Sequence, residues 1–177
     1  MAKKNRGPRE YLFVDGYNII NSWEVLKELK DTNLEEARNK LIAIMMEYQH
    51  YSGIVTTIVF DAHLVKGNSG TKEKHGDLKV VYTKENDTAD HYIERKLDKI
   101  GKIKRVRVAT SDWMEQQIIL GRGGTRISAR ELEMEVFSGR KVISKNRLKE
   151  NQKNNFMLGR LDEDTIKKLN NWNYKDK

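Results

Sequence analysis

The stretch Tyr11-Leu-Phe-Val-Asp15-Gly-Tyr-Asn18-Ile-Ile20 decides the fold. The apolar run at 12–14 has no polar alternation, which is typical of a strand covered on both faces. Asp15 follows at the carboxyl end of this strand, and Gly16 allows a tight turn into a helix. Ligands bind outside the carboxyl ends of strands in open parallel sheets. A single aspartate at a turn is also an ordinary cap residue, so its meaning depends on the other strands.

Three further segments, at 54–60, 78–83 and 104–110, are predicted strands. Asp61 follows the first, Asp87 and Asp90 open the helix after the second, and Asp112 follows the third. Helices are predicted between and after the strands, at 23–30, 34–52, 87–99, 113–120 and 128–137. This alternation predicts an α/β fold, with three α/β/α layers around a central, mainly parallel sheet of about four or five strands.

Acidic residues thus end all four predicted strands. In a parallel sheet these ends meet at one edge, and carboxylates gathered there repel one another unless a cation is present. Carboxylate oxygens in a chain without cysteine favour Mg²⁺ or Mn²⁺. Such a metal site activates water and stabilises the charge of a reacting phosphate, so the pattern indicates phosphoryl chemistry.

The positive charge of the chain lies at its ends. The net charge is +8 over 177 residues, of which residues 1–9 contribute +4 and residues 140–153 contribute +5. We therefore expect a flexible basic arm at 1–9, a domain at 10–139 and a basic extension at 140–177 with a final helix at 161–172. Basic arms commonly bind phosphate backbones, although they can also be solvated tails. Candidate RNA contacts in the extension are Arg140, Lys141, Lys145 and Arg147.

Two loops carry further candidate contacts for RNA. Lys66 lies in a polar loop at 63–77, and Arg122 and Arg126 flank the glycines of a loop at 121–126. Glycines can admit a phosphate to backbone N–H groups with arginines as clamps, but connections between helices also often need glycine.

No apolar run approaches the ~20 residues of a membrane span, and the basic N-terminus lacks the apolar stretch of a signal peptide. We therefore expect a cytoplasmic protein without a membrane partner. The absence of cysteine excludes disulfides and thiol chemistry.

Several motifs together resemble the YacP-like NYN family, a branch of the PIN-like nucleases. They are Val14-Asp-Gly-Tyr-Asn18, Val59-Phe-Asp-Ala-His63, Thr88-Ala-Asp90, Ala109-Thr-Ser-Asp112 and Ser128-Ala-Arg-Glu131. The resemblance covers roughly residues 10–139 and continues weakly into the tail. It implies a Mg²⁺- or Mn²⁺-dependent endoribonuclease, without a small-molecule cofactor, that cleaves mRNA in association with the ribosome.

The same resemblance implies roles for individual residues. Asp15 and Asp90 would be the principal metal ligands, Asp112 would complete the site, and Asp61 would lie in or beside it. Asn18 would orient a ligand or a phosphate. The implied reaction is in-line attack of metal-activated water on a phosphodiester, leaving 5′-phosphate and 3′-hydroxyl ends.

Two readings from other classes remain open at this point. In the first, the acids are caps and turns of a non-catalytic module that binds RNA or the ribosome. In the second, the chain is a small-molecule phosphatase of haloacid-dehalogenase type. That chemistry requires a second aspartate two residues after the nucleophile, where this sequence has Tyr17.

Overall fold

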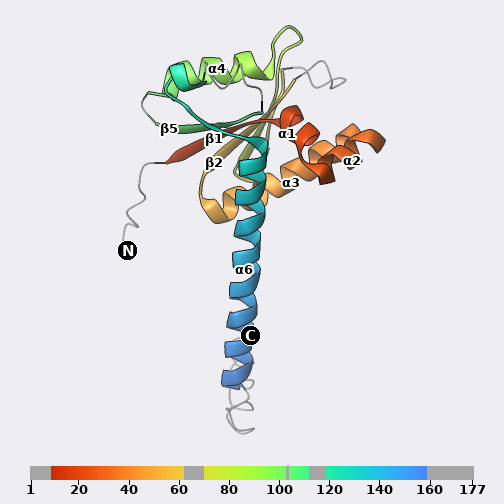
Figure 1. The fold of residues 1–177 in the computed structure, drawn as a ribbon, viewed down its shortest axis with the longest axis vertical. Helices are drawn as coiled ribbons and strands as arrows, with labels where there is room; N and C mark the ends of the chain where they lie inside the picture. Colours follow the sequence, from red (N-terminus) through yellow and green to blue (C-terminus); the bar gives the residue numbers. More distant parts are fainter. Residues whose placement is uncertain (1–8, 62–69, 103, 112–118, 159–177) are drawn as a thin grey trace, which may run out of the picture. The chain divides into compact units, whose positions relative to one another are not determined.

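The computed structural model describes residues 9–61, 70–102, 104–111 and 119–158. These residues form an α/β fold around one six-stranded sheet, in the order β3-β4-β2-β1-β5-β6 (Figure 1). All neighbouring strands are parallel except β3 and β4, which are antiparallel. The strands are β1 (Glu10–Asp15), β2 (Val55–Phe60), β3 (Lys72–His75), β4 (Leu78–Tyr82), β5 (Arg105–Ala109) and β6 (Thr125–Ile127). The predicted fold class is confirmed.

Helices cover both faces of the sheet (Figure 1). Successive side chains of a strand point to opposite faces. Leu12 and Val14 of β1 accordingly join a large apolar cluster with α1, α3 and the first turns of α6, whereas Phe13 joins a smaller cluster with α4. The helices are α1 (Gly16–Ser22), α2 (Glu24–Thr32), α3 (Leu34–Ser52), α4 (Ala89–Ile100) and α6 (Ala129–Leu158). No helix in the described ranges is long and apolar enough to cross a membrane.

Two short strands were not predicted from the sequence. β3 lies in the segment expected to be a polar loop, and β6 lies at the end of the expected glycine loop. β3 reads Lys-Glu-Lys-His and has no apolar residue, so the hydrophobic pattern cannot reveal it; main-chain pairing to β4 holds it in the sheet. β6 has only three residues, too few to show a period. The sheet therefore has six strands rather than four or five.

The helix expected to end near Phe137 continues to Leu158 as α6. A single glycine within a helix costs only about 1 kcal/mol, so Gly139 does not end it. The chain divides into two compact units, Met1–Phe137 and Ser138–Lys177. Most of the helix expected at 113–120, and all of the one at 161–172, lie outside the described residues.

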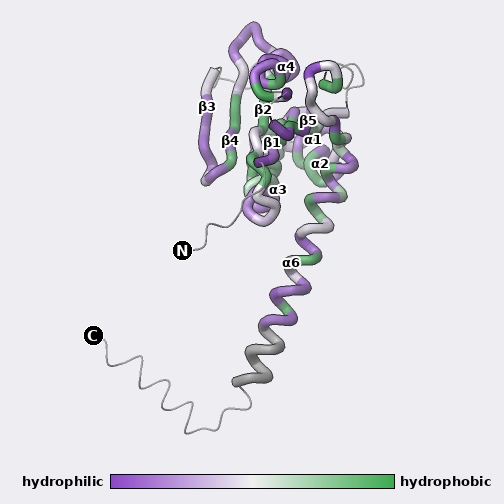
Figure 2. The backbone as a smooth tube through the Cα atoms, turned by 90° about the vertical axis from the view of Figure 1, so that its left-hand side faces the viewer, coloured by the Kyte–Doolittle hydropathy of each residue, from purple (hydrophilic) through white to green (hydrophobic). Residues whose placement is uncertain are grey.

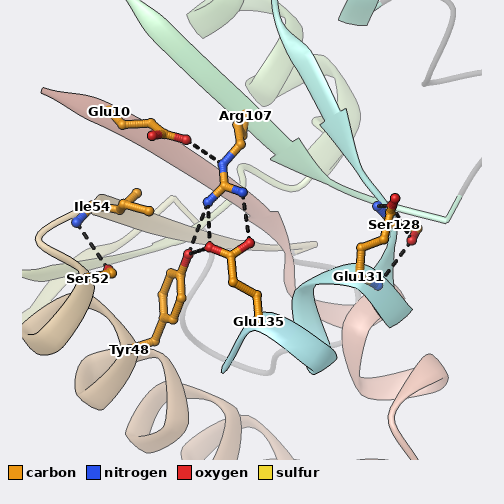
Figure 3. Close-up of polar contacts among 8 residues, drawn as sticks. All are labelled: Glu10, Tyr48, Ser52, Ile54, Arg107, Ser128, Glu131 and Glu135. Atoms are coloured by element: carbon orange, nitrogen blue, oxygen red, sulfur yellow. Dashed lines mark hydrogen bonds and ion pairs between the residues drawn. The ribbon is translucent and has the colours of Figure 1, made fainter. Parts of the chain in front are cut away.

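A polar network joins the start of α6 to the sheet (Figure 3). The Arg107 guanidinium of β5 donates from Nη1 to Glu135 Oε2 at 2.9 Å and from Nη2 to the Tyr48 hydroxyl at 3.0 Å. Its Nε lies 2.6 Å from a carboxylate oxygen of Glu10. Tyr48 in turn donates to Glu135. One arginine thus connects β1, β5, α3 and α6, and the bond to Glu135 raises the pKa of Arg107 above its already high usual value.

We expect Arg107→Met to lower the free energy of unfolding by about 2–3 kcal/mol, because it leaves two carboxylates without their cation. The loss is smaller than the 3–5 kcal/mol typical of a fully buried pair. It can be measured by urea unfolding. Arg105→Met, two residues away and exposed, should change stability by less than about 0.5 kcal/mol. Equal losses in the two variants would contradict a specific role for the network.

Candidate active site

Asp15 lies at the point where β1 becomes α1. Its side chain caps the helix, and Oδ1 accepts a hydrogen bond from the Asn18 N–H at 3.1 Å. The turn is tight because residue 16 is glycine: a Cβ there would lie 2.2 Å from a ring carbon of Phe60. The Phe60 ring can therefore pack against the turn only when residue 16 has no side chain. This contact fixes the carboxylate at the carboxyl end of the central strand.

Asp61 follows the neighbouring strand β2 and is tied to α4. Its Oδ1 accepts a hydrogen bond from the Ala89 N–H, the first residue of α4, at 2.6 Å. Thr88 caps the same helix by accepting from the His91 N–H at 3.2 Å. Asp90 lies in the first turn, where the helix dipole stabilises negative charge. The end of β2 and the start of α4 are thus fixed to each other by a carboxylate.

Asn18 connects α1 to the segment that follows β5. Its side-chain oxygen accepts a hydrogen bond from the Ser111 N–H at 2.9 Å, across 93 residues of sequence. Ser111 immediately precedes Asp112, which lies outside the described residues. Asn18 therefore positions the chain leading to the fourth predicted acid. Nothing in the sequence pairs these two residues, and only the parallel neighbours β1 and β5 bring them together.

The charges of Asp61 and Asp90 act on Asp15. Burial raises the pKa of Asp15 to about 7, the Asn18 N–H opposes this, and the charges of Asp90 and Asp61 raise it further. Within the described residues, no three acidic or histidine side chains are arranged to hold a metal ion. The donors nevertheless suit a hard cation: carboxylate oxygens are its preferred ligands, and Asp61 and Asp90 lie close enough to Asp15 to disfavour its ionised form when no cation is present.

Asp87, two residues before α4, and two further acids of α4 have cationic partners. Asp87 accepts two hydrogen bonds from Arg95, at 2.9 and 2.5 Å, and these hold its pKa below the usual range. Arg122 donates to Glu94 at 3.3 Å and also pairs with Asp98. Asp87 is thus engaged away from Asp15.

The predicted RNA contacts lie in different parts of the chain. Arg122 would bind phosphate in competition with its two carboxylate partners, whereas Arg126 is exposed on β6. Lys141, Lys145 and Arg147 are exposed on α6 beyond residue 138, and Arg140 is partly exposed there. Lys66 lies outside the described residues. These assignments remain predictions.

Comparison with known proteins identifies the family. The sequence model for the YacP-like NYN domain matches residues 12–174. The chain belongs to this family. A relative in Bacillus subtilis, named YacP and described as uncharacterized, is 49% identical over 128 residues, which cover 72% of this chain and 75% of the relative. The family suggests nuclease activity.

The fold of this NYN-family chain is similar to that of a solved relative. The crystal structure of Rae1 (YacP) from Bacillus subtilis matches with a TM-score of 0.71 and 42% identity, over 94% of this chain and 95% of that one. A tryptophan-to-leucine mutant of the same protein matches with the same TM-score over 81% of this chain and 84% of that one.

We expect Asp15→Asn to stabilise the metal-free protein increasingly as the pH rises from about 4 to about 8. The pKa of Asp15 is about 7 in the folded chain against 3.8 for the free side chain. The folded state therefore holds the proton more tightly than the unfolded state, so the wild type loses stability as the pH rises through this window. At ~1.4 kcal/mol per pKa unit, the variant should gain roughly 2–4 kcal/mol at pH 8 relative to pH 4.

Urea unfolding in EDTA at several pH values measures this difference. Asp87→Asn is the control, because its carboxylate is paired with Arg95 and should show no such gain. A constant difference between Asp15→Asn and wild type across the pH range would show that burial does not oppose ionisation of Asp15.

Proposed function

We propose that this protein is a Mg²⁺- or Mn²⁺-dependent endoribonuclease. The observation that carries the proposal is the partly buried carboxylate of Asp15 at the carboxyl edge of a parallel sheet, with Asp61 and Asp90 close enough to raise its pKa. Parallel sheets bind ligands at this edge, and a gathering of carboxylates is the environment that a hard cation stabilises. Membership of a family with nuclease character supports the same chemistry.

Each acid has a distinct task in this proposal. Asp15 and Asp90 would hold the cation, with Asp112 as a further ligand. One oxygen of Asp61 accepts a hydrogen bond from the Ala89 N–H, so Asp61 also keeps the first turn of α4, which contains Asp90, in place. Asn18 holds the segment before Asp112 through Ser111. A bound Mg²⁺ or Mn²⁺ would supply an activated water and stabilise the charge on the phosphate.

We further propose that the substrate is mRNA bound to the ribosome in the cytoplasm. Two features support it: the family resemblance of the motifs and the basic residues at both ends of the chain. Exposed Lys141, Lys145 and Arg147 of α6 are suited to ribosomal or messenger phosphates.

We expect Asp15→Asn and Asp90→Asn each to reduce RNA cleavage by more than about 100-fold, beyond the 10–100-fold typical of outer partners of a metal site. Asparagine keeps the size of the side chain but removes the charge that would hold the cation. Cleavage of a labelled RNA under single-turnover conditions measures the effect. Asp87→Asn is the matched control, since it is an acid of the same segment whose carboxylate pairs with Arg95.

The control should cleave within about threefold of the wild type, because its charge is not needed at the site. Wild-type cleavage by Asp15→Asn or Asp90→Asn would remove that residue from the active site. If all variants and the wild type bind RNA equally and none cleaves, the chain is the non-catalytic binding module.

We expect cleavage to require Mg²⁺ or Mn²⁺, to stop in EDTA and to leave 5′-phosphate ends. The four histidines of the sequence are far apart along the chain, and they form no evident paired-histidine motif for cleaving RNA by general acid–base chemistry without a metal. The assay uses purified protein and mRNA, with and without ribosomes, and analyses the product ends. A 2′,3′-cyclic phosphate product would show that the 2′-hydroxyl of the RNA attacks, contradicting hydrolysis by water. Equal cleavage rates with and without ribosomes would contradict the ribosomal part of the proposal.

A further inference from the structure

Three exposed lysines lie on one face of the β3–β4 hairpin. Lys74 of β3 is the register partner of Lys79 of β4, and Lys72 is the partner of Val81. The intervening residues of β4, Leu78, Val80 and Tyr82, point the other way into the large apolar cluster. Lys72, Lys74 and Lys79 therefore project from the opposite face, and together we call them the lysine face. Figure 2 shows that β3 is hydrophilic along its length and lies at the edge of the sheet.

The lysine face is on the same side of the sheet as α4. Lys79 is in register with Thr57, and Thr57 with Phe13, whose side chain packs in the cluster that contains α4 residues. Register partners point to the same face. α4 packs mainly on β1, β2 and β5. The lysines of β3 and β4 lie beyond this cover and are exposed.

The lysine face is also continuous with the acidic site. Asp15 is in register with Val59, Val59 with Val81, and Val81 with Lys72. Three steps between strands of about 4.8 Å place the two backbones roughly 14 Å apart. Lys74 and Lys79 occupy the row two residues further from the carboxyl edge. A chain of phosphates crossing the lysine face would thus lead toward Asp15.

The charge of this face is uncompensated within the described part of the chain. Glu73 and His75 point to the other face of the hairpin, where they pair at 3.0 Å. Asp87, at the start of the helical segment, is held by Arg95. None of the three lysines has an ion pair among the described residues.

α4 adds a further cation beside the lysine face. Tyr92 of α4 is close enough to Lys72 to feel its charge: burial raises the pKa of Tyr92, and Lys72 opposes this rise. Lys96 Nζ lies 5.4 Å from the centre of the Tyr92 ring. Helix α4, which contains Asp90, thus places the positive charge of Lys96 beside the lysine face.

Protection of a sheet edge explains only part of this pattern. Lysines on an edge strand prevent pairing with the edge of another sheet, which accounts for Lys72 and Lys74. Lys79 is on β4, which is paired on both sides by β3 and β2. An inner strand needs no such protection, so protection of the edge does not account for Lys79.

We propose that the lysine face binds the phosphate backbone of the RNA strand that enters the acidic site. This inference rests on the proposed function, since it takes RNA as the substrate. The acids at the carboxyl edge repel a phosphate chain. Lys72, about 14 Å away in the same row as Asp15, attracts it, and so do Lys74 and Lys79 in the row two residues further from this edge. The lysine face thus supplies affinity and direction, and it takes no part in bond cleavage.

The first test removes the three charges together. We expect the variant with Lys72→Gln, Lys74→Gln and Lys79→Gln to bind a fluorescent single-stranded RNA more weakly and with less salt dependence. At about 0.7 per phosphate contact, the slope of log affinity against log salt should fall by about 2. Binding is measured with Mg²⁺ on an Asp15→Asn background, so that cleavage does not interfere. In the cleaving protein, the same changes should raise KM at least tenfold and leave kcat within about twofold.

The control variant carries Lys27→Gln, Lys30→Gln and Lys40→Gln. These lysines are exposed on α2 and α3, on the other side of the sheet, and their removal changes the net charge equally. It should keep the wild-type slope. An equal loss in both variants, or no loss in either, would overturn the inference. Aggregation of the lysine-face variant with unchanged RNA affinity would also overturn it and leave edge protection as the role of these residues.

This binding test separates the inference from the proposed function. A lysine-face variant that loses affinity while the wild type fails to cleave would support the surface and contradict the nuclease. Cleavage by the wild type with an unchanged KM in the variant would support the nuclease and overturn the surface.

The second test locates the bound strand. Because the chain has no cysteine, Lys79→Cys introduces its only thiol, which can carry a photoactivated cross-linker. In a mixture of ribosomes and mRNA, we expect cross-links to the mRNA within a few nucleotides of the cleavage site. Lys40→Cys is the control and should give at least fivefold less. Cross-links to ribosomal RNA alone would overturn the proposal, because the face would then bind the ribosome and not the substrate.

Discussion

Parallel pairing of β1 with both β2 and β5 is the constraint on which the rest of this structure depends. It makes β1 a central strand, covered on both faces, and it places the ends of all three strands at one edge. Asp15, Asp61 and Ser111 are thereby neighbours although the sequence separates them widely. The side chains of β1 alternate between the two faces, so Leu12 and Val14 pack in the cluster with α1, α3 and α6, whereas Phe13 packs in the cluster with α4.

Hydrogen bonds hold Asp15 and Asp61 at the carboxyl edge of the sheet, in an environment that disfavours the ionised form of Asp15. Burial disfavours the ionised form of Asp15, and Asp90 and Asp61 add repulsion. Asp15 and Asp61 nevertheless stay in place because both accept hydrogen bonds that the fold needs: Asp15 caps α1, and Asp61 accepts from the N–H of the first residue of α4. Structural hydrogen bonds thus keep Asp15 and Asp61 at this edge, although nearby negative charge disfavours the ionised form of Asp15.

The two faces of the sheet differ in how far helices cover them. On the face of the large cluster, α3 reaches β4, and the apolar side chains of that strand are buried. On the other face, α4 packs mainly on β1, β2 and β5, and the exposed positions of β3 and β4 carry lysine. The domain without the basic ends of the chain has a net charge close to zero. Negative charges nevertheless gather at the carboxyl edge of the sheet, and positive charges gather on the lysine face. An uneven distribution of charge over a surface can orient a polyanion even when the net charge of the protein is small.

The sequence by itself determined the α/β class, the four long strands and the acids at their ends, because apolar runs and turn residues are local signals. The caps at Asn33 and Ser128 are local too, because each side chain accepts hydrogen bonds from backbone N–H groups two or three residues further along the chain. Only the tertiary structure decided that β3, without any apolar residue, joins the sheet, since main-chain pairing leaves no trace in composition. It also decided that Asn18 meets Ser111, that Asp87 turns to Arg95, and that Lys72 shares a row with Asp15. Strand order and register set these contacts, and neither is a property of any single stretch of sequence.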